Sequence, residues 1–424
     1  MKKLTSSLAA LGAVVLVAFI ASACAVDNDR PTPTQEKTGT AIVPPKGETI
    51  PVLPPIGKNP IIVVPGEVQS VPVPRKLHLV AEKNLGVMWE ALLGGSHKGF
   101  LLSTRTDGVR AAAVTAYSLE AKPLAASGFL SLTESRVTSI VGLLDGSFVV
   151  LSNRDIDGGG LGSFTTHVGV DGAFLSRATA PWYRSLKLIG KEVYGTRAVN
   201  YGTLGVNFQI GKFVDENLVH EADYWFDKER GLVYATELAF IGGKVGFAAT
   251  TLGAKSRAFA LYIQQDGKTL REHVISSWVP DKAFVEGGTT VEVWAIDIFV
   301  RDGKFAVHWW DSSRGPSAET EQKLTYVRPD GTIEYTYHIP GISSLVELDD
   351  GFAGISHVLQ SDTTFNVNVV ILRKDTSVVQ TLSIGTDADR YTTQIVKAKD
   401  GYTLGVVWRK RVTNEHHLAV VDYR

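Results

Sequence analysis

The chain has 424 residues, 44% of them hydrophobic, with a formal net charge of -1 and a single cysteine. A charge this close to zero argues against a nucleic-acid-binding protein, because such proteins present strongly basic surfaces. One cysteine also excludes a scaffold held by internal disulfides, so the folded part must be stabilised by burial of apolar side chains in a large core.

The first 23 residues predict a secretory signal peptide. Two lysines at positions 2 and 3 precede an apolar run over residues 8–21, and small residues at 21–23 stand before Cys24. Such a pattern is typical of a cleaved signal, and the run is too short for a comfortable transmembrane span. Removal of the signal takes away two lysines and no acidic residue, so the formal net charge falls from -1 to -3.

The position of Cys24 predicts a lipid anchor. A cysteine directly after such a signal resembles the lipobox of bacterial lipoproteins, which implies transfer of a diacylglyceryl group to the thiol. Ala21 stands where Leu is usual in that motif. The alternative is ordinary cleavage after Ala23, which would leave Cys24 as a free thiol. We expect lipidation and a cell-envelope location, and by the sorting rule of enteric bacteria Ala25 favours the outer over the inner membrane.

Residues 24–75 predict a flexible tether. Eleven of the 17 prolines lie in this stretch. Proline fixes φ and lacks the backbone donor, so the segment cannot form a helix or a central strand and favours extended polyproline II conformations. We interpret it as a spacer between the anchor and the folded body. A proline-rich ligand for a partner is the alternative.

Residues 76–424 predict an all-β body built from a repeated unit. An apolar strand, a tight glycine turn and a second apolar strand recur seven times, with turn glycines at 99, 146, 190, 243, 303, 351 and 401. Asp-Gly between apolar runs is a strong hairpin signal, and further Asp-Gly turns join third and fourth strands. Four short antiparallel strands at this period indicate a β-propeller blade. We predict a single propeller of seven four-stranded blades, with six or eight as alternatives.

The two ends of this body predict how the ring closes. Residues 417–424 form a third strand without a fourth, and residues 76–83 form an extra strand before the first unit. Pairing of these N- and C-terminal strands would complete the seventh blade and remove two open sheet edges.

The repeat resembles the seven-bladed propellers of the WD40/quinoprotein-like group in architecture. Trp310-Asp311 is a lone Trp-Asp pair at the end of a second strand, and the sequence has no Asp-box of sialidases and no repeated quinoprotein blade motif. The resemblance therefore implies a fold and no named propeller enzyme.

The loops predict which side of the propeller binds. Turns after first and third strands share one side, here called the Asp-Gly rim, whereas connections from second to third strands share the opposite side, the long-loop rim. The predicted long connections are 104–108, 153–164, 197–206, 250–257, 309–322, 356–365 and 408–416.

Binding residues concentrate on loops that a rigid scaffold presents together, and Arg and aromatic residues are enriched in binding hot spots. The candidate binding face contains Arg154, Arg197, Tyr201, Trp309, Trp310, Trp408 and Arg409. The alternative is that these are scattered loop residues and partly buried tryptophans.

Other constellations give weaker predictions. Asn153, Asp155 and Asp157 alternate like the start of a calcium loop, but Leu161 and Phe164 stand where a closing acidic ligand is needed. Histidines 308, 357, 416 and 417 have no spacing that imposes a metal site, and no Gly-x-Ser-x-Gly is present. Acidic residues 311, 319 and 321 are a candidate glycosidase pair without a fixed separation. We assign no catalytic residue, metal or cofactor.

These observations together predict a lipid-anchored envelope protein whose propeller binds another envelope protein and no nucleic acid. The alternative is a carbohydrate-binding or carbohydrate-active propeller enzyme. Two carboxylates roughly 5–9 Å apart at the mouth of the long-loop rim would favour the enzyme. A surface of Arg and aromatic residues without such a pair would favour binding.

Overall fold

The computed structural model describes residues 75–105, 112–124, 128–129, 135–156, 160–180, 183–200, 206–215, 217–226, 230–233, 235–253, 257–265, 269–278, 293–311, 321–339, 341–361, 364–389 and 392–424. The chain separates into two units, Met1–Ser70 and Val71–Arg424, and every described residue belongs to the second. The predicted signal, the lipidation site Cys24 and the tether up to residue 74 lie outside the described residues. Among the residues described, no helix is long and apolar enough to cross a membrane.

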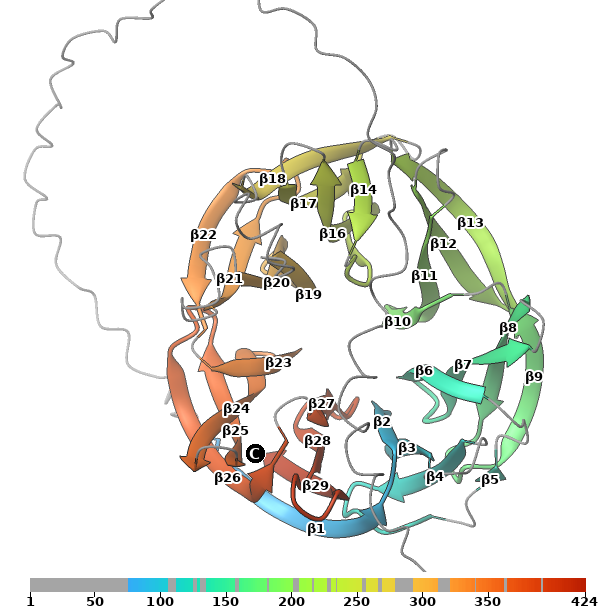
Figure 1. Cartoon of the computed structure of the whole chain (residues 1–424), viewed down its shortest axis with the longest axis vertical. Coiled ribbons are helices and arrows are strands. Elements are labelled where there is room, and N and C mark those ends of the chain that lie inside the picture. The colour runs from blue at the N-terminus through green and yellow to red at the C-terminus, as the bar shows by residue number, and fades with distance from the viewer. Residues whose placement is uncertain are drawn as a thin grey trace, which may run out of the picture. The chain divides into compact units, whose positions relative to one another are not determined.

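Seven antiparallel sheets form a closed ring in chain order, which confirms the predicted seven-bladed β-propeller (Figure 1). Blade 1 consists of β2 (Glu90–Gly95), β3 (Gly99–Arg105), β4 (Ala113–Ser118) and β5 (Gly128–Phe129). Blade 2 consists of β6 (Ser135–Gly142), β7 (Phe148–Ile156), β8 (Gly160–Val168) and β9 (Phe174–Ala180). Blade 3 consists of β10 (Ser185–Ile189), β11 (Glu192–Asn200), β12 (Val206–Val214) and β13 (Asn217–Phe226).

Blade 4 is irregular because its innermost strand is in two pieces, β14 (Arg230–Val233) and β15 (Ala239–Ile241). Both pieces pair with β16 (Lys244–Gly253), which is followed by β17 (Arg257–Gln264) and β18 (Leu270–Trp278). Blade 5 consists of β19 (Val293–Arg301), β20 (Lys304–Asp311), β21 (Glu321–Val327) and β22 (Ile333–His338). Blade 6 consists of β23 (Ile342–Glu347), β24 (Gly351–Ser361), β25 (Thr364–Arg373) and β26 (Val378–Ala388).

Blade 7 joins the two ends of the propeller, as predicted. Its strands run in the order β27 (Gln394–Lys397), β28 (Thr403–Arg409), β29 (Glu415–Tyr423) and β1 (Leu77–Val87). The β1 strand is antiparallel to β29, with Leu77 opposite Tyr423 and Val87 opposite Glu415. The first strand of the fold therefore covers the edge that the last strand would expose.

Positive φ is found at the glycine of several described Asp-Gly turns, namely Gly146, Gly172, Gly303, Gly331 and Gly401. In the turn between β19 and β20, Asp302 and Gly303 both have positive φ, 50° and 70°. A two-residue hairpin of type I′ requires positive φ at both central residues, and Gly and Asp tolerate it better than most residues.

The apolar core lies between the blades. Each of the seven clusters of buried residues joins two neighbouring blades. Phe208 of blade 3 stacks on Phe247 of blade 4 with ring centroids 4.0 Å apart, for example. Successive residues of a strand face opposite sides, so a middle strand covered on both sides is apolar throughout. Burial of each such aromatic side chain contributes about 1.5–3 kcal/mol.

Candidate functional site

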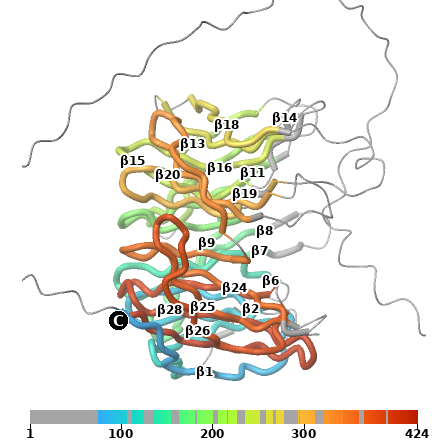
Figure 2. Tube along the Cα trace, turned by 90° about the vertical axis from the view of Figure 1, so that its left-hand side faces the viewer, coloured from blue at the N-terminus to red at the C-terminus, as the bar shows by residue number. Residues whose placement is uncertain are grey.

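Both ends of the described chain lie at the Asp-Gly rim. First and third strands of a blade end at this rim, and β29 is the third strand of blade 7. The Lys76 amide donates to the Arg424 carbonyl at 2.9 Å, so the start of β1 and the C-terminus are adjacent. Figure 2 shows this end of β1 beside the C-terminus on one side of the propeller.

The backbone at the start of β1 is held by one glutamine of blade 6. The Gln380 amide group donates to the Arg75 carbonyl, and its oxygen accepts a hydrogen bond from the Leu77 amide at 2.8 Å. These two bonds replace the pairing that a neighbouring strand would provide. The chain therefore enters the propeller at a fixed point between blades 6 and 7.

The Arg75 side chain strengthens this attachment. Its guanidinium carbon lies 4.8 Å from the ring centroid of Tyr402 and 5.8 Å from that of Tyr423, both in blade 7. One guanidinium nitrogen lies 3.8 Å from a carboxylate oxygen of Asp350 in blade 6. We refer to Arg75, Gln380, Asp350, Tyr402 and Tyr423 as the Arg75 clamp.

Two tryptophans of the predicted binding face lie in the core instead. Trp408 of β28 and Trp309 of β20 are 0% and 3% exposed. Trp408 stacks on His417 with centroids 5.2 Å apart, and the Trp309 indole N–H donates to Thr325 at 2.9 Å. The prediction that they are loop-tip contacts is wrong, because both strands extend through these positions and the side chains face neighbouring blades.

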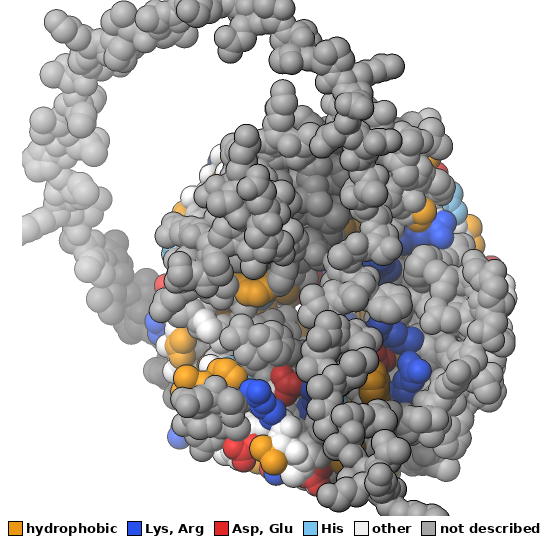
Figure 3. Space-filling view, in the orientation of Figure 1, with side chains coloured by type: hydrophobic (Ala, Val, Ile, Leu, Met, Phe, Trp, Pro, Cys, Tyr) orange, Lys and Arg blue, Asp and Glu red, His pale blue; other side chains and the backbone are white. Residues whose placement is uncertain are grey.

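The two arginines whose side chains are described make internal contacts. The Arg409 guanidinium pairs with the Asp389 carboxylate, and Arg197 donates to Gln209 while lying 5.5 Å from the Tyr183 ring. Trp310 is half-buried. The side chain of Arg154 and all of Tyr201 lie outside the described residues. Among the described residues, Figure 3 shows Lys and Arg side chains (blue) toward the right of the face it presents and hydrophobic side chains (orange) toward its lower left.

Some side chains at the long-loop rim are exposed. Trp89, just before β2, is 54% exposed, and its amide donates to the carbonyl of Arg105 at the end of β3. Arg136 of β6 is 66% exposed in its side chain and pairs with Glu90 at 3.0 Å. Val412, between β28 and β29, is 78% exposed. Trp89 and Arg136 lie at the starts of first strands, outside the connections from second to third strands that supplied the candidates, and Val412 is neither an arginine nor an aromatic residue.

The calcium candidate begins in a strand rather than in a loop. Asn153 and Asp155 lie in β7 and pair with Ser163 and Leu161 of β8. The Asn153 side-chain oxygen accepts a hydrogen bond from the Ser163 hydroxyl at 2.7 Å. Asp157 lies outside the described residues. Within the described part of the chain, no group of three or more His, Cys, Asp or Glu residues could hold a metal ion.

A cluster of charges that was not predicted from the sequence lies inside the ring. The Lys187 ammonium of blade 3 lies 3.2 Å from Asp297 of blade 5 and 3.6 Å from Glu237 of blade 4. It also donates to the Ile298 carbonyl at 2.7 Å. Blades 3 and 5 are not neighbours, so this side chain must reach across the space that the innermost strands enclose. We call Lys187, Glu237 and Asp297 the central triad.

Burial and mutual attraction shift the pKa values of the triad. Burial opposes the charge of Lys187, but Asp297 and Glu237 outweigh it and raise the lysine pKa. Burial raises the pKa of Glu237 to about 7, although the neighbouring Lys187 acts in the opposite direction. A carboxyl group that titrates near neutrality beside a second carboxylate is one signature of acid-base sites and also of structural ion networks.

Of the acidic residues proposed from the sequence as a carboxylate pair, the structure describes the side chain of Asp311 alone. Asp311 pairs with Lys323 at 2.6 Å, Glu319 lies outside the described residues, and nothing is described of the Glu321 side chain. Glu237 and Asp297, which come from different blades, share the ammonium of Lys187. Lys187 lies in the innermost strand of its unit, between Leu186 and Leu188, and a charge there was the available sequence signal.

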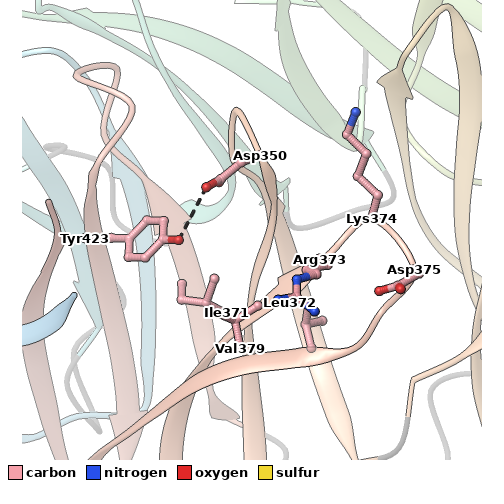
Figure 4. Close-up of a pocket in the computed structure, with 8 residues that line it drawn as sticks. All are labelled: Asp350, Ile371, Leu372, Arg373, Lys374, Asp375, Val379 and Tyr423. Atoms are coloured by element: carbon pink, nitrogen blue, oxygen red, sulfur yellow. Dashed lines mark hydrogen bonds between the residues drawn. The ribbon is translucent and has the colours of Figure 1, made fainter. Parts of the chain in front are cut away.

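A pocket of about 440 Å³ opens at the Asp-Gly rim, between blades 6 and 7 (Figure 4). Its apolar part consists of Ile371, Leu372 and Val379. Charged side chains of Asp350, Arg373, Lys374 and Asp375 surround it, together with Tyr423. The Tyr423 hydroxyl donates to Asp350 at 3.4 Å, and Lys374 pairs with Asp302 at 2.7 Å.

Comparisons with known proteins identify the fold alone. No protein-family model matches the chain, and no curated protein sequence matches it. The polysaccharide lyase Uly1 superposes with a TM-score of 0.52 at 9% identity, over 81% of this chain and 99% of that one. The β-propeller domain of the trilobed protease from Pyrococcus furiosus gives 0.48 at 10% identity, covering 78% and 95%. Sqt1 from Chaetomium thermophilum gives 0.40 at 12% identity, covering 78% and 82%.

Proposed function

We propose that this protein is a lipid-anchored cell-envelope protein whose β-propeller binds a partner protein of the envelope through its long-loop rim. The observation that carries the proposal is the Arg75 clamp, which attaches the N-terminal tether at the Asp-Gly rim. A lipid on Cys24 is then connected to the propeller at the Asp-Gly rim, the side opposite the proposed binding rim. By the sorting rule considered above, the membrane is the outer membrane.

The contact residues proposed at this rim are Trp89, Arg136 and Val412, with the half-buried Trp310. Trp89 is exposed, and its chain neighbour Glu90 pairs with the exposed Arg136. Tryptophan and arginine are both enriched in protein-binding hot spots. The proposed contact residues replace Trp309 and Trp408, whose burial makes them unsuitable as contacts. The nearly neutral charge of the chain gives no reason to expect an acidic polymer as the ligand.

Affinity purification followed by mutagenesis tests the proposal. The detergent-solubilised protein is used to isolate its partner, and binding is then measured with Trp89→Ala/Val412→Ser. Binding should weaken roughly tenfold or more if these are hot-spot residues. The matched control is Leu144→Ser/Val214→Ser, which alters two exposed apolar residues at turns of the Asp-Gly rim. Loss of binding in the control alone would place the partner on the Asp-Gly rim and contradict the proposal.

A carbohydrate-active enzyme is the second candidate, and the central triad is the observation in its favour. Glu237 with a pKa of about 7 next to Asp297 has the chemistry of a general acid beside a carboxylate. We rank it second because Lys187 occupies the position between the two carboxylates. Polysaccharide cleavage that is lost in Glu237→Gln, with the fold intact by circular dichroism, would reverse this order.

A further inference from the structure

The pocket between blades 6 and 7 lies directly beside the point where the tether reaches the propeller. Asp350 and Tyr423 form part of the pocket and also contact the Arg75 guanidinium. Val379 of the pocket is the chain neighbour of Gln380, which binds the Arg75 backbone. An extended chain advances at most about 3.6 Å per residue, so the residues just before Arg75 cannot leave this neighbourhood.

Those residues match the apolar part of the pocket in chemistry. Residues 71–74 are Val-Pro-Val-Pro, with no charge and no polar side chain. Each valine precedes a proline and is restricted to extended conformations, so the segment loses little conformational entropy when it binds. Proline-rich segments of this kind dock on aromatic-lined grooves through their side chains rather than through strand pairing.

The pocket offers the complementary surface. Ile371 and Leu372 form its floor but are only 2% and 1% exposed, so Val379 provides the accessible apolar contact, and the Tyr423 ring stands at the edge of the pocket (Figure 4). Val378 and Val379, at the start of the outermost strand β26, are 57% and 42% exposed. Successive residues of a strand face opposite sides, so Val379 faces the pocket and Val378 does not. Burial of the exposed Val379 under a short apolar segment would be stabilising.

We propose that residues 71–74 dock into this pocket and strap the tether to the Asp-Gly rim. The occupant is the chain's own segment because the Arg75 clamp holds it next to the pocket at a high effective concentration. The strap extends the attachment from Arg75 across blade 6 and fixes the direction in which the tether leaves the propeller. This inference concerns the tether alone and does not require the long-loop rim to bind a partner.

Disulfide trapping tests the proposal in the chain from residue 24 onward, with Cys24→Ser so that no other thiol is present. The pair Val73→Cys/Val379→Cys should form an intramolecular disulfide under mild oxidation, because the two Cβ atoms must come within about 4.5 Å. The control pair Val73→Cys/Val274→Cys uses an equally exposed valine in blade 4 and should stay reduced. Similar trapping in both pairs, or none in the first, would overturn the strap.

A second measurement does not depend on disulfide geometry. Val71→Ser/Val73→Ser should lower the melting temperature by about 2 °C, whereas Val63→Ser/Val64→Ser, farther along the tether, should leave it unchanged. Equal melting of both variants and the parent contradicts docking. If the cysteine pair instead joins two chains, the pocket accepts the tether of a second copy and the proposal fails.

Discussion

At the residue scale, Lys187 compensates two carboxylates and links three blades. Its ammonium links blades 3, 4 and 5 through Glu237, Asp297 and the Ile298 carbonyl. A buried ion pair is weak evidence of net stability, but removal of one partner is costly because it leaves the remaining charges without compensation.

Replacement of Lys187 should therefore destabilise the propeller. We expect Lys187→Met to lower the free energy of unfolding by about 2 kcal/mol, less than for a fully buried pair because these side chains remain partly exposed. Lys187→Met/Glu237→Gln/Asp297→Asn should recover part of the loss, because the uncompensated carboxylates are gone. The matched control is Lys191→Met, at an exposed position of the same blade. Denaturant unfolding that shows Lys187→Met and Lys191→Met to be equivalent would contradict this role.

Two buried histidines predict sensitivity to acid. Burial lowers the pKa of His308 to about 4, and burial with the nearby Arg409 lowers the pKa of His416 to about 4. A histidine whose pKa is lowered by folding stabilises the folded state above its unfolded-state pKa, which is near 6.5. This stabilisation is lost as the pH falls toward the folded-state pKa of about 4. Glu237 acts in the opposite direction, because its raised pKa favours the folded state below 4.5 and loses that contribution as the pH rises through about 7.

Melting curves between pH 4 and pH 8 separate these contributions. In His308→Leu, the melting temperature should fall less than in the parent as the pH drops from 6.5 to 4. In Glu237→Gln, the melting temperature should fall less than in the parent as the pH rises from 4.5 to 7. An exposed histidine changed in the same way, His97→Leu, should leave the curve parallel to that of the parent. Parallel curves for His308→Leu would exclude it as a source of acid sensitivity.

At the scale of elements, β1 is the strand on which closure depends. It pairs with β29 along its length, and Glu82 accepts a hydrogen bond from the buried His417 at 3.0 Å. Ala81 and Leu85 of β1 pack against the cluster between blades 7 and 1. Without β1, that cluster and the edge of β29 would be open to water and to other chains.

Truncation measures this dependence. Deletion of residues 24–70 should leave the melting temperature nearly unchanged, because it spares β1, the Arg75 clamp and the proposed strap. Deletion of residues 24–87 should lower it sharply and promote aggregation. Equal melting temperatures for the two truncations would mean that β1 contributes nothing to closure.

The hairpins were the most predictable elements, and the side-chain environments the least. The turn glycine of the third unit was predicted at position 190, and Gly190 lies between β10 and β11 with a φ of 63°. Such a glycine turn is a local signal that the sequence displays directly. Trp309 and Trp408 were misplaced because alternation along a strand gives the side of a residue but not where the strand ends. The central triad could not be predicted, because its members come together only when three blades are arranged around one axis.

At the scale of the whole molecule, the proposed lipid on Cys24 predicts that the protein is recovered with the membranes. Cys24→Ser should release the protein from the membrane fraction, because acyl chains contribute about 0.8 kcal/mol for each buried CH₂. Fractionation and the mass of the N-terminal peptide check this. Equal membrane recovery of the parent and the variant, with no lipid mass on the parent, would show that the anchor is absent.

The pairing of β1 with β29 also governs when the chain can finish folding. Glu82 and His417 bond across a separation of 335 residues, so blade 7 cannot form until the last strand has been synthesised. Contacts this distant in sequence slow folding, because the loop-closure entropy must be overcome before they contribute. Until that pairing forms, the edges of β1 and β29 are open to proteases and to other copies of the chain. Closure of the ring therefore depends on one pairing between the first and the last strands of the propeller.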